Sequence, residues 1–212
     1  MQISIVTGLL VIIVIVSIKA WNDTQIYQKF LFSPREIKDN GEWLRFITSG
    51  FIHADYMHLG FNMFALLMFG QPLLDIMKSQ ELFGNMGDLA FSGLFILGII
   101  FSHLPDYWRY KDGYYKSLGA SGGVSSIVFA YVLINPLAKL GLLFIPIYIP
   151  GFIFASLYLI YSYQKAKVGN DNIGHTAHFV GSIFGLVFML AFHPWLLEHF
   201  WGQIKDYSLS FF

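Results

Sequence analysis

Apolar residues gather along this chain into long stretches that polar segments separate. The first stretch covers residues 1–21, and its centre, residues 9–16, contains only Leu, Ile and Val. Five more follow at about 57–77, 89–104, 118–133, 146–163 and 175–192. These lengths approach the roughly 20 residues that an α-helix needs to cross the hydrocarbon core of a bilayer. The pattern predicts an all-α membrane protein with six transmembrane helices and both chain ends on one side.

The first stretch has the position of a secretory signal but not its composition. It lacks a basic amino-terminal region and a small-residue cleavage site. Lys19 and Trp21 at its end are residue types that anchor helices at membrane interfaces. We therefore expect a retained transmembrane helix.

The connection over residues 22–56 is long for a membrane loop. It contains Trp43, Phe46, Phe51 and Ile52 among its charged residues, which is too apolar for a solvated linker. We expect a folded and partly embedded loop. Because no internal repeat or low-complexity tract interrupts the chain, residues 1–212 are predicted to form one domain, with an aromatic-rich tail at 194–212 in the membrane interface.

Composition agrees with a lipid-facing exterior. The 212 residues are 56% hydrophobic and 12% charged, whereas soluble domains are about 45–50% apolar and about 25% charged. A formal net charge of zero gives no reason to expect nucleic acid as a partner. The absence of cysteine excludes disulfides and thiolate metal sites.

Polar residues inside the apolar stretches are the candidates for function, because an unpaired polar group in hydrocarbon costs several kcal/mol. His58 and Asn62 are four residues apart and share one helix face. Ser121 lies among small residues at the start of the fourth stretch, and the sixth stretch contains His175 and His178.

Small residues in the sixth stretch predict which histidine faces a neighbouring helix. They form a stripe, the pattern by which two membrane helices approach closely. At 100° per residue, His178 lies about 55° from the centre of this stripe and His175 about 115°. We therefore expect His178 to face the small residues around Ser121. The stripe consists of Gly174, Ala177, Gly181 and Gly185.

A serine and a histidine that meet there have a known chemistry. A neutral histidine within about 3 Å activates a serine as a nucleophile, and His58, Asn62 and the Ser121 amide are suitable donors to the resulting oxyanion. The sixth stretch has no Asp or Glu, so the pair would be a dyad, and no metal or organic cofactor is expected. Taken singly, these residues fit helix packing or a proton relay in a small channel or transporter.

Together, in this order, the residues resemble the rhomboid family of intramembrane serine proteases. The resemblance implies a six-helix rhomboid-like bundle in which Ser121 is the nucleophile, His178 is the general base, and His58, Asn62 and the Ser121 amide form the oxyanion hole. It also implies that Trp43 and Arg45 anchor the loop and that glycines pack the helices. The motifs are Glu42-Trp43-Leu44-Arg45, His58-x-x-x-Asn62 preceded by His53, Gly119-x-Ser121-Gly122, and Ala177-His178 followed by Gly181 and Gly185.

The activity that the resemblance implies is hydrolysis of peptide bonds in or near transmembrane helices. The partners would be single-pass or polytopic membrane-protein substrates within the lipid bilayer. A catalytically silent relative that binds membrane proteins is the alternative. Many relatives place a tyrosine against the catalytic histidine four residues after the nucleophile, where this chain has Ser125. Another group must then hold the imidazole, and Phe179 and Ser125 itself are candidates.

Charge distribution and the resemblance disagree on orientation. The resemblance implies an active site on the extracytoplasmic side, whereas the positive-inside rule favours the reverse. We follow the family, because a long folded loop weakens the charge count. With the amino terminus inside, the inner loops carry only Lys78, Lys139 and Lys205. The outer ones carry Lys19, Lys29, Arg35, Lys38, Arg45, Arg109, Lys111, Lys116, Lys165 and Lys167.

Overall fold

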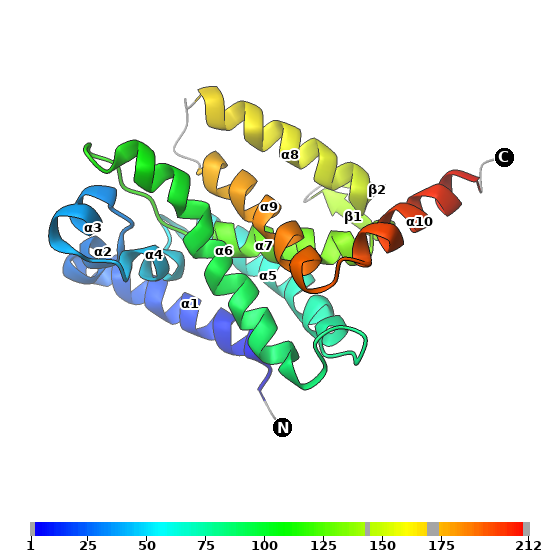
Figure 1. The fold of residues 1–212 in the computed structure, drawn as a ribbon. Helices are drawn as coiled ribbons and strands as arrows, with labels where there is room; N and C mark the ends of the chain where they lie inside the picture. The colour runs from blue at the N-terminus through cyan, green and yellow to red at the C-terminus, as the bar shows by residue number, and fades with distance from the viewer. Residues whose placement is uncertain (1–2, 143–144, 169–173, 210–212) are drawn as a thin grey trace.

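The protein is a bundle of α-helices (Figure 1). The computed structural model describes residues 3–142, 145–168 and 174–209. Within these ranges four helical stretches are long and apolar enough to cross a membrane. They are α1 (Ile5–Asn22), α5 (Tyr56–Met77), the stretch Gly84–Tyr110 formed by η2 (Gly84–Met86) and α6 (Gly87–Tyr110), and α9 (His175–Phe192). The predicted all-α membrane bundle is confirmed, and the chain is a multi-pass membrane protein.

The centre of the bundle is a shorter apolar helix, α7 (Ser121–Ile134), which packs against α5, α6 and α9 (Figure 1). Residues 122–130 of α7 are all buried. On the outside, α5 exposes the apolar side chains Phe61, Phe64, Leu67 and Met68. The bundle therefore has a buried central helix and an apolar exterior suited to lipid.

The connection from α1 to α5 is folded, as predicted. It consists of α2 (Thr24–Phe30), α3 (Pro34–Asn40), α4 (Arg45–Thr48) and η1 (Ser49–Phe51). The Asp23 carboxylate caps α2 by accepting from the amides of Gln25 and Ile26. Phe32, Ile37 and Phe46 are buried against Tyr107 of α6. This small apolar cluster fixes the loop beside the end of α6.

The fifth apolar segment differs from its predicted range, 146–163. A hairpin of β1 (Lys139–Leu142) and β2 (Ile145–Pro150) comes first, and α8 runs over Gly151–Val168. Pro146 and Pro150 explain the difference, because proline lacks the amide hydrogen of a helix interior and favours extended backbone before it.

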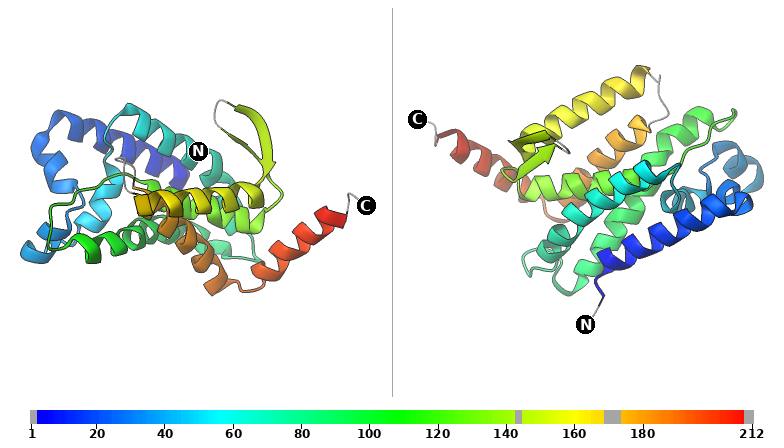
Figure 2. Two further views of the ribbon diagram at one scale, coloured as in Figure 1. Left: turned by 90° about the horizontal axis from the view of Figure 1, so that it is seen from above. Right: turned by 180° about the vertical axis from the view of Figure 1, so that it is seen from behind.

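Another helix extends past its predicted range, and the predicted tail at 194–212 contains a helix. The helix expected at 89–104 continues as α6 to Tyr110, with Pro105 inside it. The tail forms α10 (Leu196–Leu209), which projects from the bundle (Figure 2). Side chains of His199 and Gln203 lie 3.0 and 3.1 Å from the carbonyl of Ile134 at the end of α7.

Candidate active site

Ser121 is the first residue of α7. The amides of a first helical turn have no partner within the helix, so this serine lies where backbone N–H groups are available to an anion. Gly119, two residues earlier, has φ +117°, a conformation that favours glycine. A Cβ atom there would also lie 2.6 Å from Cε1 of His58. Both the turn and the His58 ring therefore require glycine beside the serine.

Glycines bring α7 and α9 together at backbone distance. A Cβ on Gly181 would lie 2.3 Å from the Gly122 carbonyl oxygen, and one on Gly185 would lie 2.2 Å from that of Ser126. The Ser126 hydroxyl lies 2.9 Å from the carbonyls of both Gly122 and Gly181. The two contacts are four residues apart on each helix, so the helices run parallel in a fixed register.

This register determines the level of His178 relative to Ser121. Ser121 is one residue before Gly122, and His178 is three residues before Gly181. At 1.5 Å per residue the two positions differ by about 3 Å along the helix axes. Among the described residues, however, no hydrogen bond joins the Ser121 hydroxyl to the His178 ring.

The His178 ring has two aromatic neighbours. Tyr158 of α8 stacks on it at 6.3 Å between ring centroids and 23° between planes. His175 is edge-on at 6.0 Å and 80°. The expected candidate Phe179 packs instead on Tyr163, at 5.5 Å. The other candidate, Ser125, contacts Tyr158 through its hydroxyl oxygen, 3.5 Å from that of the tyrosine.

His58 and Asn62 lie one turn apart on α5. The Asp55 carboxylate accepts from the His58 amide at 2.8 Å and caps this helix. The buried Asn62 side chain donates from Nδ2 to the His58 carbonyl at 2.9 Å. Since the His58 ring lies against Gly119, it is close to the segment that carries Ser121.

His53, which the motif contained without an assigned role, connects the loop to that same segment. Its Nε2 accepts from the Ala120 amide at 3.3 Å, and its Nδ1 lies 3.0 Å from the hydroxyl oxygen of Ser17 on α1. That hydroxyl donates to the Phe51 carbonyl at 3.1 Å. The proton of His53 is therefore on Nδ1. Burial and, to a lesser extent, the neighbouring His58 lower the pKa of His53 to about 3, so the ring is neutral. We call the four residues Ser17, Phe51, His53 and Ala120 the His53 network.

Further contacts attach the loop to residues 117–119. The backbones of Phe32 and Ser117 exchange two hydrogen bonds, at 3.0 and 3.1 Å, and the Gly119 amide donates to the Ser49 carbonyl at 2.9 Å. The ring of Phe32 stacks on His103 of α6 at 4.1 Å. The backbone leading into Ser121 is thus held by hydrogen bonds with two positions of the loop, Phe32 and Ser49.

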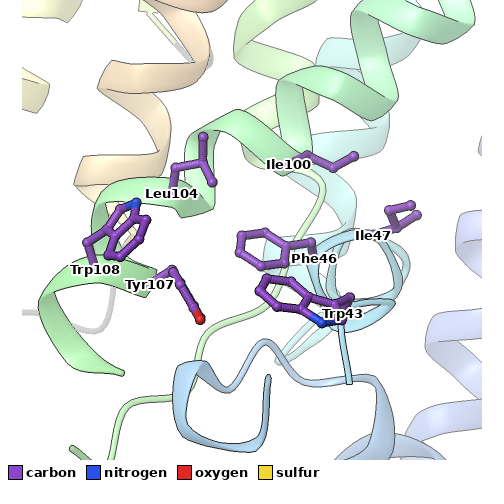
Figure 3. A pocket seen from close by; sticks show the side chains of 7 residues that line it. All are labelled: Trp43, Phe46, Ile47, Ile100, Leu104, Tyr107 and Trp108. Atoms are coloured by element: carbon purple, nitrogen blue, oxygen red, sulfur yellow. The ribbon is translucent and has the colours of Figure 1, made fainter. Parts of the chain in front are cut away.

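Arg45 and Trp43 occupy different environments in the loop. Arg45 is 8% exposed, and its Nη1 lies 2.8 Å from the carbonyls of both Gln28 and Leu31. Trp43 is 59% exposed and stacks on Phe46. It borders a pocket of about 380 Å³ between the loop and α6 (Figure 3). The lining residues, which are aromatic or aliphatic, are Trp43, Phe46, Ile47, Ile100, Leu104, Tyr107 and Trp108.

Two contact residues were given no role from the sequence. Tyr158 is one of several aromatic residues along α8, and nothing in its spacing distinguishes it from Tyr161 or Tyr163. His53 had a better signal, because it follows the apolar pair Phe51 and Ile52 in a segment predicted to be embedded.

Comparison with known proteins matches this chain to one protein family. The Rhomboid domain matches residues 40–195. Presenilin-associated rhomboid-like protein A, mitochondrial, of Danio rerio is 24% identical over 78% of this chain and 43% of its own length. Rhomboid protein 1, mitochondrial, of Saccharomyces cerevisiae is 26% identical over 80% of this chain and 46% of its own. The chain thus spans less than half the length of these relatives.

Proposed function

Since this chain belongs to the rhomboid family, we propose that it is an intramembrane serine endopeptidase that hydrolyses peptide bonds in or near transmembrane helices of other membrane proteins. One observation carries the proposal. The backbone contacts of Gly181 and Gly185 with α7 support it, because the register they fix leaves His178 and Ser121 about 3 Å apart along the helix axes, at the amino terminus of a buried helix.

In the proposed reaction, Oγ of Ser121 attacks the carbonyl carbon of the scissile bond while His178 takes the hydroxyl proton. The tetrahedral intermediate has a negatively charged oxygen, to which the Ser121 amide, His58 and Asn62 donate. His178 then protonates the leaving amine. Water hydrolyses the acyl-serine ester in a second step, with His178 again acting as the base.

A helical substrate needs local unwinding before this attack. In a helix each carbonyl accepts a hydrogen bond from an amide four residues later, which shields it from a nucleophile. We therefore expect cleavage next to glycine or other residues of low helix propensity. The substrates are single-pass or polytopic proteins within the same bilayer.

The proposal is tested with purified protein in liposomes and a model transmembrane substrate. Ser121→Ala and His178→Ala should each abolish cleavage, and a fluorophosphonate probe should label the wild type at Ser121 but not the His178 variant. Ser92→Ala is the matched control, because its hydroxyl donates within α6 to Asp88. Undiminished cleavage by the Ser121 variant would reject the mechanism.

A catalytically silent membrane-protein binder is the second candidate, and one observation favours it. The hydrogen bond between Ser121 and His178 is not formed among the described residues. Catalytic hydrogen bonds are often long in enzymes without substrate and tighten in the complex. The same probe experiment separates the two: a binder captures membrane proteins yet reacts with no fluorophosphonate.

We further propose that the site faces the extracytoplasmic side. Asp112 lies exposed beyond the end of α6, at the end of the molecule that carries the loop and Ser121. A cysteine placed at Asp112 should react with an impermeant reagent added from outside intact cells. Labelling only after the membrane is opened would reverse the assignment.

A further inference from the structure

The ring of His178 is oriented by packing. Its ring contacts are the stacked ring of Tyr158 and the edge-on ring of His175, and among the described residues the imidazole makes no hydrogen bond. A general base must present one nitrogen to its proton donor within narrow limits of distance and angle. The group that limits rotation of this ring therefore matters for its reactivity.

Tyr158 is itself held from two sides. Its hydroxyl oxygen lies 3.5 Å from that of Ser125, one turn after Ser121 on α7. Its ring packs on Phe129 of α7 and Phe154 of α8, each at 5.8 Å between centroids. The small side chain of Ser125 leaves the space that the tyrosine occupies. One side chain from α8 thus contacts both helices of the proposed dyad.

The helix that carries Tyr158 is lightly packed. Among the described residues of α8, only Gly151 and Ser162 are buried. Figures 1 and 2 show α8 on the outside of the bundle, alongside α9 and away from α1. Elements with few buried contacts are those that move at low free-energy cost. A displacement of α8 would withdraw Tyr158 from His178.

We propose that Tyr158 is a positioning residue for His178, and that the reactivity of the base therefore depends on the position of α8. This rests on the proposed dyad. The tyrosine touches the imidazole and not the reacting atoms, so it acts through the orientation of His178.

The experiment compares Tyr158→Phe, Tyr158→Ala and the double variant Tyr158→Ala/Ser125→Tyr in liposomes. Tyr158→Phe keeps the ring and should retain cleavage within about 3-fold. Tyr158→Ala should lower kcat and the rate of fluorophosphonate labelling about 10- to 100-fold, as misplacement of a catalytic group does, with KM little changed. Its Tm should fall as well, because the ring contacts with Phe129 and Phe154 are lost. The double variant supplies a ring from α7 and should recover most of the loss.

Tyr163→Ala is the matched control, because Tyr163 is also on α8 but packs on Phe179. Labelling rates measured against pH give a readout that general destabilisation does not produce, since a reoriented base changes the pH profile. Cleavage by Tyr158→Ala within 3-fold of wild type across the profile would overturn the inference, as would an equal loss in Tyr163→Ala. If Ser121→Ala is also active, the proposed function itself has failed.

Discussion

The two sides of the candidate site are built differently. On the side of Ser121, the backbone of residues 117–120 is hydrogen-bonded to Phe32, Ser49 and His53 of the loop. Phe32 stacks in turn on His103 of α6, and His53 bonds to Ser17 of α1. On the side of His178, the stacked neighbour Tyr158 comes from α8, in which half of the residues are exposed and only Gly151 and Ser162 are buried. The backbone before Ser121 is thus held by polar contacts with the loop, and the His178 ring by aromatic contacts that include a lightly packed helix.

The difference shows how a membrane protein combines a rigid site with access to it. A buried, fully bonded backbone loses several hydrogen bonds if it moves, so it does not move alone. An aromatic contact is non-directional and weaker, about 0.5–1.5 kcal/mol beyond burial. Substrate access is therefore expected on the α8 side, and the following substitutions test the contrast.

The largest effect is expected at the contact between α7, which carries Ser121, and α9, which carries His178. Gly181→Ala puts a methyl group 2.3 Å from the Gly122 carbonyl, so α7 and α9 must separate. We expect a loss of about 3 kcal/mol in stability and of more than about 100-fold in cleavage. Gly93→Ala is the control, because nothing lies within 4 Å of that Cβ position. Equal Tm values for both variants in thermal unfolding would contradict the close approach.

Arg45→Met should destabilise the loop between α1 and α5. It leaves the carbonyls of Gln28 and Leu31 without their donor in a buried position. Unsatisfied buried groups of this kind cost about 2–4 kcal/mol in total. Arg35→Met, at an exposed arginine paired with Asp39, should leave Tm unchanged. Urea titration of both variants measures the contrast, and matching midpoints would remove the role given to Arg45.

A fall in pH should lower the stability of the folded protein, because His53 is neutral in the folded state and its ring bonds to the segment before Ser121. The folded protein holds the pKa of His53 at about 3, against 6.5 for an exposed histidine, so the unfolded chain binds the proton first as the pH falls. The contribution of His53 is fully present above pH 6.5 and is lost between pH 6.5 and 3. Tm measured from pH 7 to 4 should fall in the wild type and fall less in His53→Phe. Parallel curves would exclude His53 as a source of the acid sensitivity.

The smallest effect is expected on the outer face of α8. Ile160 is 55% exposed, so Ile160→Ala should change stability by less than about 0.5 kcal/mol. Cleavage should also stay within about 2-fold, because Ile160 follows Tyr158 by two residues and so lies about 200° from it around the helix. A drop in Tm comparable with that of Arg45→Met would mean that α8 is packed as firmly as the loop.

Much of this architecture follows from hydrophobic pattern. The long apolar stretches predicted the helices, and the apolar content of residues 22–56 predicted a folded connection. Both depend on removing apolar side chains from water. The β hairpin was missed, since an apolar run of six residues fits a strand or a helix equally well. Pro146 and Pro150 were the local signal against a helix there.

Polar residues in an apolar stretch, such as Ser121, His58 and His178, were selected from the sequence as candidates for the same reason. Tyr158 was not, because a tyrosine in a membrane helix is unremarkable in sequence and its contact with His178 depends on how α8 is placed. The pairing of His53 with the Ala120 amide depends likewise on tertiary structure that spacing does not encode.

The glycine contacts between α7 and α9 also have a mechanical consequence. Because carbonyl groups and Cα atoms meet there with no side chain between them, the joint is stiff. When the bilayer changes thickness or is stretched, we expect the contact between α8 and the rest of the bundle to deform first. Few residues of α8 are buried in that contact. We expect the separation of α7 and α9 to stay constant while α8 tilts. Cleavage rates in bilayers of graded lipid chain length, compared between wild type and Tyr158→Phe, measure this difference in stiffness.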